Sequence, residues 1–93
     1  KMLIKIRKNH DALKRGSFKW IDGLEDLVGY VRETDKEKII VLINNNDEEK
    51  HVELKTSALE CLELTENEKI DIVINKMNIS MKPYSIKILH EVR

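Results

Sequence analysis

The chain has 93 residues, enough for one hydrophobic core and not two, because small domains bury a limited share of their surface. Its 17 basic residues balance 17 acidic ones, so no net field draws it to a polyanion. This balance removes the main driving force for binding nucleic acid or an anionic membrane, and no apolar run approaches the ~20 residues that cross a bilayer. We therefore expect no nucleic-acid and no membrane partner.

The cysteine content bears on the cellular compartment. Cys61 is the only cysteine, so no internal disulfide can form, and a reducing compartment fits better than an oxidising one. The basic start of the chain lacks the unbroken apolar stretch of a signal peptide. We expect a cytoplasmic location, and leave open whether a longer parent polypeptide carries a secretion signal upstream.

The first predicted element is a helix over residues 1–16. At about 100° per residue, one stripe of this helix collects Met2, Leu3, Ile6, His10 and Leu13. Gly16 ends the helix, because glycine accepts the left-handed C′ conformation. No capping side chain precedes Lys1, and Lys1 is not an initiator methionine. We interpret the chain as a piece of a longer polypeptide whose other part carries the chemistry.

From Ser17 onward the pattern becomes that of short strands. Phe18 and Trp20 share one face of a first strand, and Asp22-Gly23 supplies turn chemistry after it. A second strand alternates over residues 27–33.

The strongest predicted strand is the third, Lys38 to Asn44. It is apolar at every position from Ile39 to Ile43, so we expect both of its faces to be covered. The next turn is predicted at Asn44-Asn45-Asn46-Asp47, because short amide and carboxylate side chains bond to nearby backbone and tolerate positive φ.

The remaining pattern completes an antiparallel series. Further strands are predicted at residues 50–54, 59–64, 70–75, 77–81 and 84–92. Pro83 is expected at the start of the last one, since proline cannot donate a ladder hydrogen bond. The predicted fold class is mainly β: an antiparallel Greek-key β-sandwich of about seven to eight strands preceded by one N-terminal α-helix.

Metal, cofactor and nucleophile sites are not predicted. The candidate metal ligands, His10, His51, His90 and Cys61, lack a second histidine or cysteine two to four residues away, so the recurring spacing of zinc sites is missing. Cys61 sits in an apolar strand, where a buried thiol is inert packing. The three glycines do not form a phosphate-binding loop.

Four aromatic residues are the candidates for saccharide contact: Phe18, Trp20, Tyr30 and Tyr84. Phe18 and Trp20 would line one face, with Tyr30 and Tyr84 elsewhere. The favoured interpretation is that these rings fill the core beside Val28, Leu42 and Ile86, where aromatic side chains bury most area. The alternative is saccharide contact through Trp20 and Tyr30.

One known family matches three stretches of the chain in order: LIKIRKNHDALKRGSF, LVGYVRETDKEKIIVLINNND and MKPYSIKIL. They resemble the last barrel helix and its following turn, the second and third C-terminal strands, and the closing strand of α-amylase superfamily glycoside hydrolases. The matching helix positions are Leu3, Ile4, Ile6, Arg7, Ala12, Leu13 and Gly16. Asp11 stands where the family usually has proline. The group that the chain most resembles is that of neopullulanases, cyclomaltodextrinases and maltogenic amylases.

The resemblance implies that the catalytic carboxylates lie on a (β/α)₈ barrel upstream, and none of them maps onto this chain. It divides the chain into residues 1–16, the end of that barrel, and residues 17–93, a C-terminal β-sandwich. The expected function is a non-catalytic domain that stabilises and shields the barrel of an enzyme acting on α-1,4/α-1,6-glucans. The alternatives are a module that binds starch or maltooligosaccharides and an oligomerisation domain. The isolated chain should expose an apolar patch through which it can self-associate.

Overall fold

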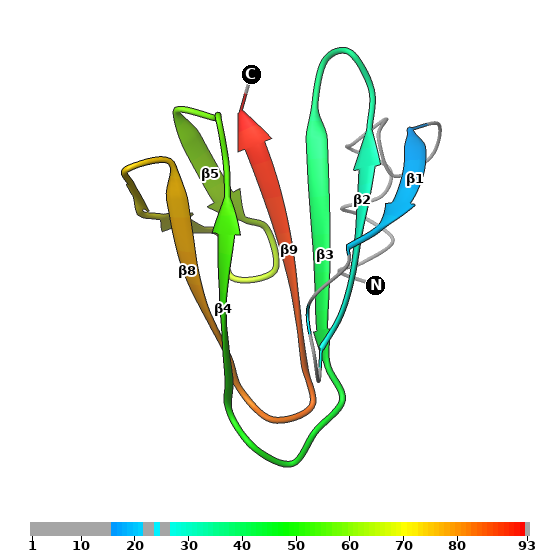
Figure 1. The fold of residues 1–93 in the computed structure, drawn as a ribbon, viewed down its shortest axis with the longest axis vertical. Helices are drawn as coiled ribbons and strands as arrows, with labels where there is room; N and C mark the ends of the chain where they lie inside the picture. The colour runs from blue at the N-terminus through cyan, green and yellow to red at the C-terminus, as the bar shows by residue number, and fades with distance from the viewer. Residues whose placement is uncertain (1–15, 22–23, 25–26, 93) are drawn as a thin grey trace.

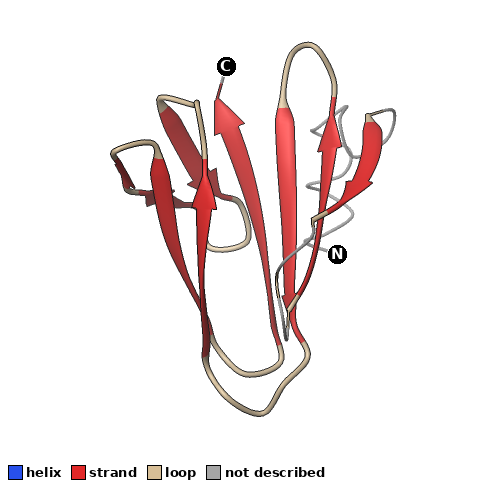
Figure 2. Cartoon of the chain, viewed as in Figure 1, coloured by secondary structure: helices blue, strands red, loops and turns tan. Residues whose placement is uncertain are grey.

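A computed structural model describes residues 16–21, 24 and 27–92 of the chain. The predicted helix over residues 1–16 lies outside these residues except for Gly16, and so does the predicted turn at Asp22-Gly23. The described part is mainly β: it contains nine strands in two antiparallel sheets and no helix (Figure 2).

The larger sheet has six strands in the spatial order β1-β2-β3-β9-β5-β6 (Figure 1). Their bounds are β1 Ser17–Trp20, β2 Val28–Glu33, β3 Lys38–Asn44, β5 Glu60–Glu63, β6 Glu68–Ile70 and β9 Ser85–Val92. The smaller sheet has three strands in the order β4-β8-β7. Their bounds are β4 Lys50–Lys55, β7 Ile72–Val73 and β8 Lys76–Met81.

The main hydrophobic core lies between the two sheets. The six-stranded sheet contributes Ile40, Leu42, Cys61 and Leu89, and the three-stranded sheet contributes Leu54, Met77, Ile79 and Met81. In β8 these buried residues alternate with exposed Lys76, Asn78 and Ser80. Period-2 alternation of this kind is what a sheet with one solvated face requires.

The central strand β3 is buried on both faces, as its unbroken apolar run predicts. Ile40 and Leu42 point into the core between the sheets. Ile39 and Val41 form a second cluster with Ile88 on the opposite side, and Tyr30, Ile43 and Leu64 pack against it. The prediction that both faces of this strand are covered is confirmed.

One predicted strand, over residues 70–75, is wrong. The segment belongs to two strands: β6 ends at Ile70 in the six-stranded sheet, and β7 begins at Ile72 in the three-stranded sheet. Ile74 and Asn75 then form the turn into β8, with φ of 50° and 60°. Alternation of side chains continues across a change of sheet, so periodicity alone could not detect the break at Asp71.

Asn44 joins the two turns at the lower end of the molecule in Figure 1. It is 1% exposed, and its Nδ2 donates to the carbonyl oxygens of Glu48, Met81 and Lys82 at 2.9, 3.1 and 3.0 Å. Its Oδ1 accepts from the backbone N–H of Asn46 at 3.1 Å. The polar turn predicted at Asn44 to Asp47 is thus present and is also tied to the turn between β8 and β9.

Pro83 lies in that second turn, two residues before β9 begins. The next residue, Tyr84, has a φ of 50°, and its backbone N–H donates to the carbonyl oxygen of Asn46 at 3.1 Å. The prediction that the proline stands at the start of the last strand is confirmed to within two residues. Its missing N–H falls where no ladder bond is needed.

Candidate docking face

The six-stranded sheet has one face that points away from the three-stranded sheet, which we call the outer apolar face. Ile40, Leu42 and Leu89 point into the core, so their neighbours along each strand point outward. Antiparallel register then aligns the outward residues across the strands. On β1, β2, β3 and β9 they are Phe18, Trp20, Val28, Tyr30, Arg32, Ile39, Val41, Ile43, Ile86, Ile88 and His90.

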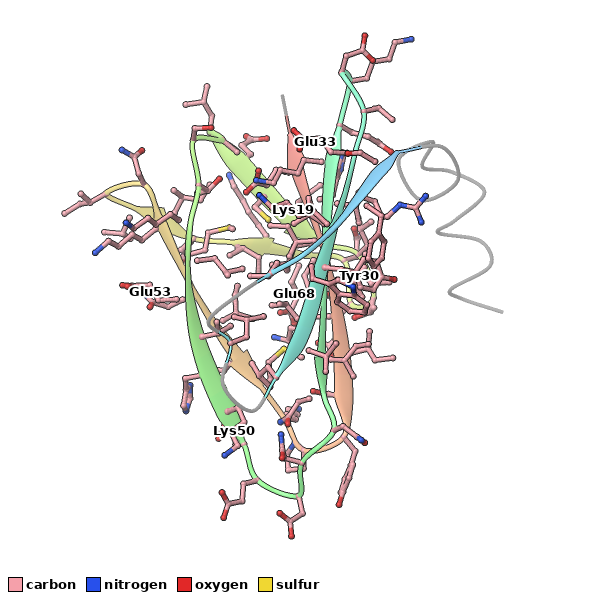
Figure 3. All side chains as sticks on the ribbon, turned by 45° about the vertical axis from the view of Figure 1, so that its right-hand side comes forward. Lys19, Tyr30, Glu33, Lys50, Glu53 and Glu68 are labelled. Atoms are coloured by element: carbon pink, nitrogen blue, oxygen red, sulfur yellow. The ribbon has the colours of Figure 1, made fainter. Side chains whose placement is uncertain are left out.

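Three aromatic rings meet on this face at β1 and β2. The centroids of Phe18 and Tyr30 are 4.9 Å apart with nearly parallel planes, 27° from coplanar. Trp20 stands edge-on to both, with its centroid 5.0 Å from that of Phe18 and 5.9 Å from that of Tyr30. Figure 3 shows Tyr30 on the opposite side of the molecule from Glu53, which lies on the three-stranded sheet. The expectation that Tyr30 would lie away from Phe18 and Trp20 is therefore wrong.

Arg32 fixes the start of β1 to β2. Its Nε and Nη2 both donate to the carbonyl oxygen of Gly16, at 3.3 and 3.1 Å. The same guanidinium lies 5.9 Å from the ring centroid of Phe18, within range of a cation–π contact. One side chain thus holds both the backbone at the entry to the sheet and the first ring of the aromatic group.

A large part of the outer apolar face is exposed. Phe18 is 49% exposed, Trp20 58%, Val28 45% and Ile86 42%. The register connects them, since Val28 pairs with Ile43 and Ile43 pairs with Ile86. The interpretation of Phe18 and Trp20 as core residues is wrong, because neither ring enters the core between the sheets. The predicted exposed apolar patch is present instead.

The outer face of the three-stranded sheet is polar on β4 and β8, where its outward residues are His51, Glu53, Lys55, Lys76, Asn78 and Ser80. On the edge strand β7, Val73 pairs with Lys76 and is 60% exposed. His51 Nδ1 lies 3.0 Å from Ser80 Oγ, and Lys76 Nζ lies 3.9 Å from Glu53 Oε1. The two outer faces of the molecule therefore differ: one has the composition of a solvated surface and the other that of an interface.

Cys61 is a buried and unreactive thiol. It is fully buried in the main core. Burial, together with the nearby carboxylates of Glu91 and Glu63, raises the pKa of its thiol to about 12. The thiol therefore stays protonated near neutral pH, as an inert packing residue should.

Two buried carboxylates were missed by sequence reasoning. Glu63 accepts from the backbone N–H groups of Ile88 and Glu66 at 2.7 and 2.8 Å. Glu91 accepts from Thr56 Oγ1 at 2.7 Å and lies 3.7 Å from Lys38 Nζ. The available signal was alternation, since Glu63 shares the inward face of its strand with Cys61. Both carboxylates are occupied by internal partners, which gives them a structural role.

The two described histidines lie on opposite outer faces of the molecule. His51 lies on the polar outer face, and His90 lies on the apolar one, 3.5 Å from Glu37 Oε2. His10 falls outside the described residues. Across residues 16–21, 24 and 27–92, no three His, Cys, Asp or Glu side chains group as metal ligands. No helix in this part of the chain is long and apolar enough to span a membrane.

Comparison with known proteins agrees with this architecture. Alpha-amylase 2 of Dictyoglomus thermophilum is 45% identical over 49 residues, which is 53% of this chain and 8% of that protein. An Anoxybacillus alpha-amylase superposes with a TM-score of 0.85 at 20% identity, over 98% of this chain and 21% of its own. A cyclomaltodextrinase superposes with a TM-score of 0.81 at 20% identity, over 96% and 16%. At these identities the structures show a shared fold.

The chain spans less than a quarter of the length of each of these relatives. The family model for the maltogenic amylase C-terminal domain matches residues 21–88, most of the chain. This match confirms the resemblance drawn from the three sequence stretches. The chain belongs to the maltogenic amylase C-terminal domain family.

Proposed function

We propose that this chain is the non-catalytic C-terminal domain of an α-glucan-degrading glycoside hydrolase, and that it stabilises and shields the catalytic barrel. In this proposal residues 1–16 are the last barrel helix and residues 17–93 are a Greek-key β-sandwich docked on the barrel. The parent acts on α-1,4/α-1,6-glucans in the cytoplasm. The observation that carries the proposal is the outer apolar face, with Phe18, Trp20, Val28 and Ile86 half exposed.

The size of these side chains supports docking. A large aromatic side chain buries on the order of 150–250 Å² when it is covered, so covering the exposed half of Trp20 removes roughly 100 Å² from water. At ~25 cal/mol per Å² this contributes about 2–3 kcal/mol before ordering costs. Phe18, Val28 and Ile86 add to the same surface. Covering the outer face of the other sheet would bury less apolar area and would contribute less free energy.

The buried acids support a non-catalytic role. A retaining glycosidase holds two carboxyl groups about 5 Å apart across a sugar-binding cleft. Glu63 and Glu91 are instead buried and hydrogen-bonded within the domain. Their arrangement stabilises the ends of β5 and β9.

The test places a charge on each outer face of the parent polypeptide. Val28→Glu should lower the thermal midpoint of the parent, because docking would bury the new carboxylate without a partner. His51→Glu, on the polar face, is the matched control and should leave the midpoint unchanged. Val28→Glu should also leave the unfolding midpoint of the isolated 93-residue chain unchanged at concentrations where that chain is monomeric, because Val28 is 45% exposed there. Equal midpoints for both parent variants would remove the docking proposal.

The second candidate is saccharide binding through Trp20 and Tyr30, favoured by the 58% exposure of Trp20. Sugar platforms need an open ring face, and the face of Phe18 toward Tyr30 is occupied by that ring. Trp20 is therefore the principal surface on which a pyranose would stack. Titration of maltooligosaccharides while following tryptophan fluorescence discriminates the two functions. A saturable change that Trp20→Ala abolishes would favour binding over docking.

A further inference from the structure

A second surface, separate from the outer apolar face, lies at the end of the molecule where β4 ends and β8 begins, the upper end in Figure 1. A hollow there has a volume of about 600 Å³. Its lining residues are Lys38, Lys55, Thr56, Ser57, Ile74, Asn75 and Lys76. Three of these are lysines and none is acidic. The docking proposed above does not account for this composition.

Two of the lysines oppose each other directly. Lys55 and Lys76 are partners in the β4–β8 ladder, so their side chains leave the same face of the sheet side by side. Like charges in directly opposite positions destabilise a sheet. Lys76 has Glu53 at 3.9 Å, whereas Lys55 has no ion pair within the part of the chain that the structure describes. Lys55 is thus the uncompensated charge of this pair, and an uncompensated charge next to a like charge in an otherwise regular strand pairing suggests a function.

The third lysine and the rim are held in place. Lys38 Nζ lies 3.7 Å from Glu91 Oε2, and the other oxygen of that carboxylate accepts from Thr56 Oγ1 at 2.7 Å. The backbone N–H of Thr56 donates to the carbonyl oxygen of Asn75 at 2.9 Å, which fixes the loop after β4 to the turn before β8. These contacts fix Lys38 and the rim of the hollow in place.

Ser57 offers a hydrogen-bond donor at this rim. It is exposed and makes no hydrogen bond to any of residues 16–21, 24 and 27–92. A hydroxyl beside ammonium groups is a common partner set for an oxyanion, because lysine binds phosphate as a point charge and a hydroxyl adds a directed hydrogen bond.

We propose that this hollow binds an oxyanion of the phosphate class between Lys55 and Lys76, with Ser57 as hydrogen-bond donor. The anion converts the repulsion between the two ammonium groups into attraction to a shared charge. The hollow is open to solvent, so binding is weak and falls as ionic strength rises. This proposal stands whether or not the outer apolar face docks on a barrel.

The test titrates the 93-residue chain with inorganic phosphate against chloride at constant ionic strength, following backbone amide shifts by NMR. Saturable shifts are expected at Ser57, Asn75 and Lys76. Lys55→Gln should weaken the apparent affinity by roughly fivefold, the factor that corresponds to ~1 kcal/mol for an exposed charge pair.

Lys55→Glu separates binding from stability. It should abolish the phosphate response and at the same time raise the unfolding midpoint, because the introduced carboxylate would face Lys76 with the opposite charge. The matched control is Lys82→Glu, an exposed lysine in the turn at the other end of the molecule. Shifts that never saturate, or an equal loss in the Lys55→Glu and Lys82→Glu variants, would show only a general ionic effect and overturn the proposal.

A second arm identifies the source of the phosphate group. Glucose 6-phosphate presents the same oxyanion together with sugar hydroxyl groups that Asn75 can bind. Tighter binding of the ester than of inorganic phosphate would assign the hollow to phosphorylated sugars, and equal binding would assign it to free phosphate. Absence of saturable binding for both probes would refute the site.

Discussion

Asn44 shows how one residue can determine how two distant segments meet. Its amide satisfies three carbonyl oxygens and two N–H donors from two turns that are more than thirty residues apart in sequence. The run of short polar residues predicted the first turn correctly, because its bonds are local. The link to Met81 and Lys82 was not predictable, since no local pattern reports which carbonyl groups lie across from a buried amide.

Replacing Asn44 should destabilise the domain strongly. Asn44→Ala leaves buried carbonyl groups without a donor, which should cost about 2–3 kcal/mol. The urea midpoint should fall with no change in the slope of the transition. Asn45→Ala, at an exposed neighbour, is the control and should stay within ~0.5 kcal/mol of the parent sequence. Equal midpoints for the two variants would contradict the role assigned to Asn44.

At the scale of elements, strands with strong periodicity were predictable and changes of partner were not. The strand predicted at Lys38 to Asn44 coincides with β3, and the next predicted strand begins at Lys50, as β4 does. The prediction of a single strand over residues 70–75 is wrong because the residues around Asp71 alternate equally well in either sheet. The predicted placement of the aromatic rings is wrong for a related reason. Trp20 pairs with Tyr30 on another strand, and no local pattern reports this pairing. Whether a ring on one face of a strand is buried or exposed also depends on what lies opposite that face.

The turn between β7 and β8 contains a residue whose type is unfavourable for its backbone conformation. Ile74 has a φ of 50° and is 86% exposed, whereas turns of this kind favour asparagine or glycine. A β-branched residue in this conformation costs on the order of 1–2 kcal/mol. Ile74→Asn should therefore raise the thermal midpoint, and calorimetry can measure the shift.

Val73→Asn is the control for that substitution. Val73 is exposed like Ile74 but lies within β7 and is not among the residues with positive φ, so asparagine there should lower the midpoint or leave it unchanged. A stabilisation of equal size at both positions would show that loss of exposed apolar surface, and not relief of backbone strain, is the cause.

At the scale of the whole molecule, the two outer faces differ in chemistry. A sandwich that functioned alone in solution would be expected to solvate both outer faces, and only the face carrying His51, Glu53 and Asn78 is polar here. The family match and the exposed outer apolar face lead to one expectation, that the other face is covered in the intact protein.

The isolated chain should therefore associate with itself. Sedimentation velocity should show a concentration-dependent shift to larger species, because apolar burial favours contact between two outer apolar faces. Ile86→Glu, at a 42% exposed position on this face, should shift the chain toward monomer, and Asn78→Glu on the polar face should not. A strict monomer at all concentrations would count against the apolar face as an interface.

The position of β9 in the six-stranded sheet has a consequence for how the domain assembles. β9 is the last of the described strands in the chain, yet it lies in the middle of the sheet and pairs with both β3 and β5. Until this segment has been synthesised, β1, β2 and β3 have no connection through backbone pairing to β5 and β6. The six-stranded sheet can therefore close only after β9 has been synthesised, which makes its closure a late, non-local step of folding.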